Sequence, residues 1–352
     1  MKPRDLLLLP LHAAALATGA KSFRGNPLLG SPSLNARGLH VARFRLAETM
    51  ARRRRAGLRH LIDAEHVEAF ERQGFVLAPN VLPAESFHAL SREVEETEFD
   101  AREMRQGNAV TRFISLPPSV LARLPELHRF IFGRLFQGLL RYGASSSADP
   151  YVTLHTVLTK PLEGEPDPQT HFHSDTFHAT AKGWLFLRDV AMEDGPFTYV
   201  PGSHYATPGR LEWEHAQSLK AARSADPHHA LGSFRASPAE IRAMGYPEPV
   251  PFPVPANSLV VADTHGFHAR GPSARPSVRL AVYGSSRTNP FTPFTGPDLL
   301  DLPGLRGRRA QILDGLRWLE SRLTGRPESQ PLVGRLRPGD PLGFARIRER
   351  PP

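Results

Sequence analysis

The chain has 352 residues, enough for one large domain or for one domain with helical additions. Hydrophobic residues make up 40% of it, which provides a sizeable core and separates it from disordered chains. It contains no cysteine, so disulfides, thiolate zinc sites and cysteine nucleophiles are excluded. The formal charge of +9 suits an anionic partner, but no nucleic-acid-binding motif is present, and we expect no nucleic-acid partner.

Residues 1–62 differ from the rest of the chain. The apolar run at residues 6–20 is short for a transmembrane helix, and it fits a packed helix, a helix in the membrane interface or a signal-peptide core. Residues 38–62 read as a basic amphipathic helix, and the Arg52–Arg55 run is typical of a solvated face. We expect a helical extension that can make peripheral contact with the inner face of a membrane, in a cytoplasmic protein.

Residues 63–290 have the pattern of a compact domain in which helices come first and short strands follow. Residues 205–250 interrupt the strands as a helical insertion, and residues 291–352 hold one helix and a loosely ordered tail rich in proline and arginine. This order predicts a mainly β fold with flanking helices, either a sandwich or an open barrel. The expected helices cover 64–73, 83–96, 119–142 with a break near Pro125, and 305–323. The expected strands cover 74–79, 152–159, 183–190, 197–200, 258–263 and 277–283.

The first candidate metal ligands lie in the segment His-Phe-His-Ser-Asp at residues 171–175. Residues two apart in a strand point the same way, so His173 and Asp175 can face one ion. With a second histidine they form the two-histidine, one-carboxylate set that suits Fe(II) and leaves three coordination positions open. His171 shares this face, so a His171–His173 pair is an alternative zinc ligand set. Otherwise His171 lies near the ligands or the substrate.

The second histidine should come from a later strand, and the segment after residue 263 offers His265 and His268. Spacing alone does not choose between them. In residues 277–283 alternate positions are apolar, and Arg279 lies on the other face. If that face is the interior of a barrel, Arg279 needs an anion, and its guanidinium is a natural clamp for a dicarboxylate. A solvated surface strand is the alternative.

Four blocks, in order over roughly residues 65–287, carry a resemblance to a known family. They are Glu71–Pro83, Lys160–Gly164 with the His-x-Asp motif, Glu193–His204 with its Pro-Gly-Ser-His ending, and a histidine eleven residues before an arginine, which fits His268 and Arg279. Together they resemble the phytanoyl-CoA dioxygenase family of Fe(II)/2-oxoglutarate oxygenases. The family register selects His268 over His265.

The resemblance implies a double-stranded β-helix, which is a jelly-roll or cupin-like core. It implies that His173, Asp175 and His268 hold Fe(II) and that Arg279 pairs with the distal carboxylate of 2-oxoglutarate. Lys160 and Trp184 fall where family members contact the cosubstrate. Arg270 stands where the family often has a serine that bonds the cosubstrate. His171, His265 and Arg270 are therefore candidates for contacts around the ligands or the substrate.

The implied reaction consumes O2 and 2-oxoglutarate, releases succinate and CO2, and hydroxylates an unactivated C–H bond of a small-molecule or lipid-like substrate. Asp175 argues against a halogenase, in which a halide takes the place of the carboxylate. Two alternatives stay open. One is a zinc-dependent hydrolase on the same fold, and the other is a non-catalytic jelly-roll binding module at the membrane. The sequence specifies neither the primary substrate nor an oligomeric state.

Overall fold

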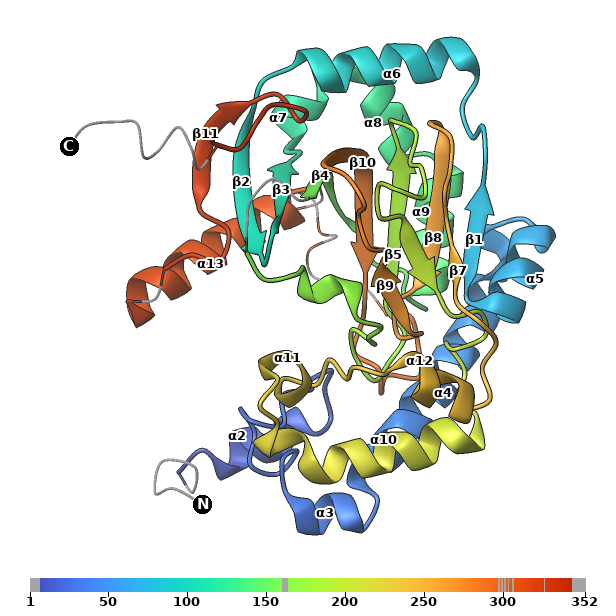
Figure 1. Ribbon diagram of the computed structural model, residues 1–352, viewed down its shortest axis with the longest axis vertical. Coiled ribbons are helices and arrows are strands. Elements are labelled where there is room, and N and C mark those ends of the chain that lie inside the picture. Colours follow the sequence, from blue (N-terminus) through green and yellow to red (C-terminus); the bar gives the residue numbers. More distant parts are fainter. Residues whose placement is uncertain are drawn as a thin grey trace.

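The computed structural model describes residues 7–159 and 164–343, apart from residues 297, 299, 301, 303, 306 and 326. Two antiparallel sheets face each other, and helices cover the outer face of the larger sheet and the lower end of the barrel (Figure 1). The larger sheet has the strand order β1-β8-β5-β10-β4-β3-β2-β11, and the smaller has the order β7-β6-β9. This is a mainly β jelly-roll core with flanking helices, so the predicted fold class is confirmed.

The strands include a hairpin, β2–β3, that the sequence pattern does not predict. Charged residues occupy much of β2, so it lacks the apolar alternation of a half-buried strand. The strands are β1 (Phe75–Ala78), β2 (Phe99–Gln106), β3 (Ala109–Ser115), β4 (Tyr151–Thr159), β5 (Ala181–Phe186), β6 (Phe197–Tyr199), β7 (Val250–Pro251), β8 (Ser258–Asp263), β9 (His268–Arg270), β10 (Ser277–Ser286) and β11 (Leu332–Leu336).

The predicted helix at 119–142 is divided into three. Pro118 and Pro125 each stand at the start of a helix, where the missing amide proton costs nothing. The helices are α2 (Leu9–Ala15), α3 (Pro32–Ala36), α4 (Leu39–Leu58), α5 (Ala64–Gln73), α6 (Ala84–Glu96), α7 (Pro118–Leu121), α8 (Pro125–Ile131), α9 (Arg134–Gly143), α10 (Pro208–Lys220), α11 (Pro227–Ala230), α12 (Pro238–Ala243) and α13 (Arg309–Thr324), with 3-10 turns at Arg59–Leu61, Pro168–Thr170 and Ala221–Arg223.

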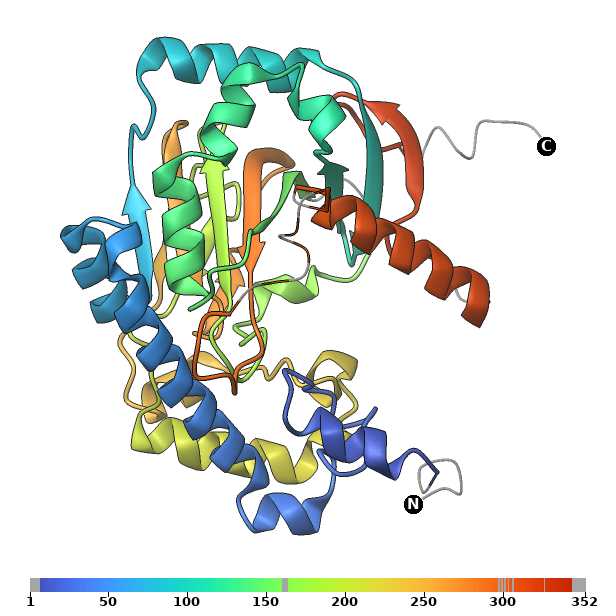
Figure 2. The same cartoon turned by 180° about the vertical axis from the view of Figure 1, so that it is seen from behind.

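Strand β10 separates the packed core from the interior cavity. Leu280 and Val282 are fully buried in the core formed with the helices behind the large sheet, where α8 and α9 lie (Figure 2). The alternate residues Arg279, Ala281 and Tyr283 line the space between the two sheets. The period of two in this strand therefore places an arginine inside the barrel, not on a solvated surface.

Helix α4 is anchored by buried arginines, so the prediction of a fully solvated Arg52–Arg55 face is wrong for two of them. Arg54 donates to the carbonyl of Ser145 at 2.8 Å. Arg55 donates to the carbonyl of Gly143 at 2.5 Å and to Asp263 Oδ2 at 2.6 Å. Gly143 ends α9, and the last carbonyls of a helix lack partners within it. The guanidinium groups supply these partners, which makes their burial possible.

The N-terminal helices and the insertion form one helical layer at the end of the barrel shown lowest in Figure 1. His40 Nε2 on α4 lies 2.8 Å from Glu214 Oε2 on α10, and the rings of Phe23 and Phe234 pack together. Both residues of the His40–Glu214 pair are buried. The insertion thus provides the packing surface for the extension.

Within the part of the chain that the structure describes, no helix combines the length and apolar character needed to cross a membrane.

The C-terminal tail is more ordered than predicted between residues 332 and 343. Strand β11 pairs with β2 at the edge of the large sheet. Arg112, fully buried on β3, donates to Glu103 Oε1 at 2.6 Å and to the carbonyls of Pro338 and Asp340 at 2.9 and 2.8 Å. Polar backbone interactions with this arginine hold the tail in place, and a hydropathy pattern does not reveal them.

The substitution Arg55→Met tests the anchoring of α4. It leaves the Asp263 carboxylate buried without its cation, so we expect the free energy of unfolding to fall by about 3–5 kcal/mol. Urea denaturation measures this change. Arg53→Met on the exposed face of the same helix is the matched control, with an expected effect within about 0.5 kcal/mol. Equal small effects from both substitutions would contradict the anchoring role.

Candidate metal centre

The His-x-Asp segment is held by two neighbours and is not a regular strand, which corrects the sequence prediction. His173 and His268 exchange backbone hydrogen bonds of 2.9 and 3.0 Å. The amide of Ser174 donates to Phe234 in the insertion, and that of Asp175 donates to Thr264. The segment therefore runs between strand β9 and the insertion, and tertiary contacts set its direction.

Three side chains converge on one point at this end of the cavity. His173 Nε2 lies 3.9 Å from Asp175 Oδ1, and His268 Nε2 lies 3.8 Å from Asp175 Oδ2. One ligand atom from each residue lies within 4.8 Å of the others. His173 Nδ1 donates to the carbonyl of His171 at 2.8 Å, and His268 Nδ1 donates to that of Gly266 at 3.0 Å. These bonds fix the tautomers and leave both Nε2 lone pairs free for a metal.

The electrostatics of the three residues fit the same role. Burial lowers the pKa of His173 and His268, so both imidazoles are neutral at physiological pH. Burial alone would raise the pKa of Asp175, but the Lys182 ammonium group and the two imidazoles hold it below its usual range. Two neutral imidazoles and one carboxylate are the donor set that a non-haem Fe(II) ion requires.

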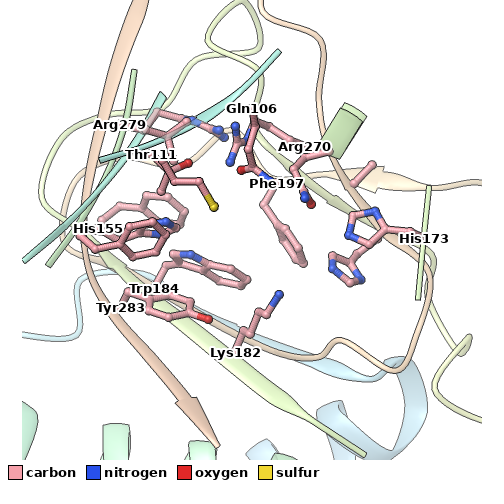
Figure 3. A pocket seen from close by; sticks show the side chains of 18 residues that line it. Gln106, Thr111, His155, His173, Lys182, Trp184, Phe197, Arg270, Arg279 and Tyr283 are labelled. Carbon is pink, nitrogen blue, oxygen red and sulfur yellow. The ribbon is translucent and has the colours of Figure 1, made fainter. Parts of the chain in front are cut away.

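The opposite end of the cavity holds an arginine with an unsatisfied donor. The cavity has a volume of about 220 Å³, and Figure 3 shows Arg279 at one end and His173 at the other. Arg279 donates to the carbonyl of Gly195, but among the described residues its buried Nε has no hydrogen-bond partner, and neither does the buried Oγ1 of Thr111. Burial, and then the charge of Arg270, lowers the pKa of Arg279 to about 9. A carboxylate would satisfy these groups.

Aromatic side chains line the cavity between its two ends. Trp184 packs against Phe197 with ring centroids 4.8 Å apart, and Tyr283 packs against His155 at the same separation. Burial lowers the pKa of His155 to about 3, so this ring is neutral and contributes an apolar face. Lys182 extends into the same space (Figure 3).

Among the cavity residues that sequence reasoning missed are Thr111, His155 and Lys182. Lys182 is two positions before Trp184 on β5, so the strand period alone indicates that it shares the inner face. For His155 and Thr111 no such signal exists, because their strands reveal which face is inner only after they are paired with β10 and with each other.

The remaining predicted residues differ in their positions. His171 contributes its carbonyl, while its side chain is exposed and lies outside the three-residue group. His265 is buried elsewhere, against Phe44 and the carbonyl of Thr176. Arg270 lines the cavity and is ion-paired with Asp167. Lys160 lies outside the described residues.

A jelly-roll cavity with two histidines and a carboxylate at one end and a buried arginine at the other defines a class, the non-haem iron oxygenases that use a 2-oxo acid. The model of the family described as "Phytanoyl-CoA dioxygenase (PhyH)" matches residues 70–272. The chain belongs to this family, and its His173, Asp175 and His268 form a group that could hold a metal ion.

The individual relatives have low sequence identity to this chain. Ectoine dioxygenase from Halomonas elongata is 30% identical over 184 residues, which cover 45% of this chain and 52% of that protein. The chain thus matches about half the length of this relative. Among solved structures, HygX from Streptomyces hygroscopicus with nickel and 2-oxoglutarate bound is 17% identical, with a TM-score of 0.40 over 70% of this chain and 94% of that chain. The carbocyclase SnoK from nogalamycin biosynthesis is 21% identical, with a TM-score of 0.39 over 64% and 83%.

The substitution His173→Ala tests the metal group. It removes one of three ligand atoms, so we expect iron affinity to fall by more than about 10-fold, since loss of even an outer hydrogen-bond partner has an effect of this size. Iron content after anaerobic reconstitution and desalting measures it. His171→Ala, two residues away and exposed, is the matched control and should retain iron. Iron loss in the control and retention in His173→Ala would reverse the assignment.

Proposed function

We propose that the protein hydroxylates an unactivated C–H bond of a small-molecule or lipid-like substrate and releases succinate and CO2. The observation that carries this proposal is the pairing, in one cavity, of a three-ligand metal group with a buried arginine whose Nε has no hydrogen-bond partner in the part of the chain that the structure describes. In this proposal His173, Asp175 and His268 hold the iron, and Arg279 binds the distal carboxylate of 2-oxoglutarate.

The chain's own residues act by binding and orientation. Thr111 Oγ1 adds a hydrogen bond to the carboxylate on Arg279, and Trp184 forms the wall along which the cosubstrate lies. When bound, iron supplies the coupling of O2 activation to oxidation of 2-oxoglutarate. The aromatic lining keeps water from the reacting atoms, and the carbonyls of His171 and Gly266 hold the two imidazoles in their ligating tautomers.

Residues 63–290 form the catalytic domain in this proposal. Residues 1–62 are the N-terminal extension, whose described part packs on the insertion at 205–250, and the C-terminal segment 291–352 contains β11, which closes one edge of the large sheet. The zinc hydrolase has less support, because the side chain of His171 lies outside the group that contains His173.

The substitution Arg279→Leu tests the proposed cosubstrate site. Loss of a buried charged contact costs about 2–5 kcal/mol, so we expect the KM for 2-oxoglutarate to rise by at least about 30-fold. Succinate release with Fe(II), 2-oxoglutarate and O2 measures this change, even without the primary substrate. Arg275→Met is the matched control, because Arg275 is an exposed arginine that pairs with Asp194. An unchanged KM in Arg279→Leu would contradict the proposed role.

Peripheral membrane contact through residues 1–60 is a separate proposal. Its support is the exposure of Leu7 at 84% and Leu11 at 68%, while the buried Arg54 and Arg55 are unavailable to lipids. We expect sedimentation with anionic vesicles, and we expect Leu7→Ser with Leu11→Ser to reduce it severalfold. Absence of vesicle binding by the unaltered protein would eliminate this proposal without affecting the oxygenase assignment.

A further inference from the structure

The N-terminal extension contributes a side chain to the metal centre. Lys21 is outside the segment that matches the family, yet its ammonium group donates to the backbone carbonyl of Asp175, one of the three candidate ligands. The two residues are 154 positions apart in the sequence. The extension therefore does more than pack on the insertion, because it contacts the backbone of a candidate metal ligand.

The position of Lys21 is fixed by its surroundings. Arg43, buried on α4, donates from its guanidinium to the carbonyls of Leu16, Thr18 and Ala20 at 3.0, 2.8 and 2.9 Å. On the other side, Gly232 approaches so closely that a Cβ there would lie 2.1 Å from the carbonyl oxygen of Lys21. Gly232 also has a φ of +83°, which favours glycine. The hydrogen bonds from Arg43 and the close approach of Gly232 together restrain the backbone at Lys21.

A second ammonium group reaches the same ligand from the barrel wall. Lys182 on β5 has its Nζ 2.6 Å from Asp175 Oδ2. It lines the cavity and points toward the metal end (Figure 3). A divalent cation held by Asp175 would offset much of the carboxylate charge that contacts Lys182 and acts through space on Lys21. Both ammonium groups then lack a full counter-charge in a partly buried site, which is unfavourable unless another anion is present.

Further positive charge surrounds the two lysines. Arg235, whose backbone bridges to His173, is paired with Asp226 at 3.5 Å, and the exposed Arg287 lies near enough to both lysines to interact with their charges. Among the described residues, Asp226 offsets the charge of Arg235. The distal carboxylate of 2-oxoglutarate would lie on Arg279 at the far end of the cavity (Figure 3), and its other carboxylate together with Asp175 would only balance the two charges of a divalent ion, so the charges of the two lysines would remain in excess.

We propose that Lys21 and Lys182 bind an anionic group of the substrate, a carboxylate or a phosphate ester, and thereby place the C–H bond to be oxidised beside the metal. This inference rests on the proposed function. Ammonium groups act as point charges and accept either anion without a fixed orientation. The cavity of about 220 Å³ is below the roughly 300–1,000 Å³ of typical ligand pockets, which favours a compact acid over a bulky one.

The test uses the full chain loaded with Mn(II) and N-oxalylglycine, an inert analogue that occupies the cosubstrate site. Calorimetry measures binding of short straight-chain carboxylates, of alkyl phosphates and of the corresponding neutral amides. We expect at least one anionic series to bind about 10-fold or more tightly than its amides, and Lys21→Met to reduce that affinity by at least about 10-fold. The series that binds more tightly identifies the anionic group.

Lys220→Met is the matched control, because Lys220 is an exposed lysine at the end of α10. It should leave anion affinity unchanged. Binding of N-oxalylglycine by Lys21→Met shows that this variant is folded. Equal affinity for amides and anions, or equal anion affinity in Lys21→Met and the unaltered protein, would overturn the inference while the oxygenase proposal stands. Failure of the metal-loaded, unaltered protein to bind N-oxalylglycine would instead count against the proposed function.

Discussion

Two backbone hydrogen bonds join His173 to His268, and the arrangement of the metal centre depends on them. They hold two imidazoles from distant segments side by side, with ring centroids 4.4 Å apart. A short irregular stretch of backbone after His173 then places the Asp175 carboxylate close to both imidazoles. Because His173 also bridges to Arg235, the same short segment ties the jelly roll to the helical insertion. The barrel, the metal group and the insertion therefore meet at one residue.

Two buried arginines show how differently a guanidinium can be satisfied in this molecule. The guanidinium of Arg55 is satisfied by Asp263 and by the end of α9. The buried Nε of Arg279, which lines the cavity, has no hydrogen-bond partner among the described residues. Burial of an unsatisfied donor is costly, and a ligand can complete it. We therefore assign Arg55 a structural role and Arg279 a role in binding an anion.

In the N-terminal extension, composition does not indicate which charged side chains are buried. A run of four arginines is typical of a solvated surface. In this helix, however, Arg52 and Arg53 are exposed, while Arg54 and Arg55 are buried. The apolar segment before it is expected to pack or to meet a membrane. The turn after that segment brings Lys21 to Asp175. A hydropathy pattern reveals neither the buried arginines nor the position of Lys21, because both depend on hydrogen bonds to carbonyl groups of residues far away in the sequence.

The sequence by itself determined the fold class, the His-x-Asp segment and the choice of His268, because family register and strand periodicity are local properties of the chain. It also placed Arg279 opposite the apolar face of its strand. The tertiary structure decided which face of β10 is interior, that His171 contributes a carbonyl and no ring, and that Lys21 and Lys182 flank Asp175. These features arise from contacts between segments far apart in sequence, and no local spacing encodes such contacts.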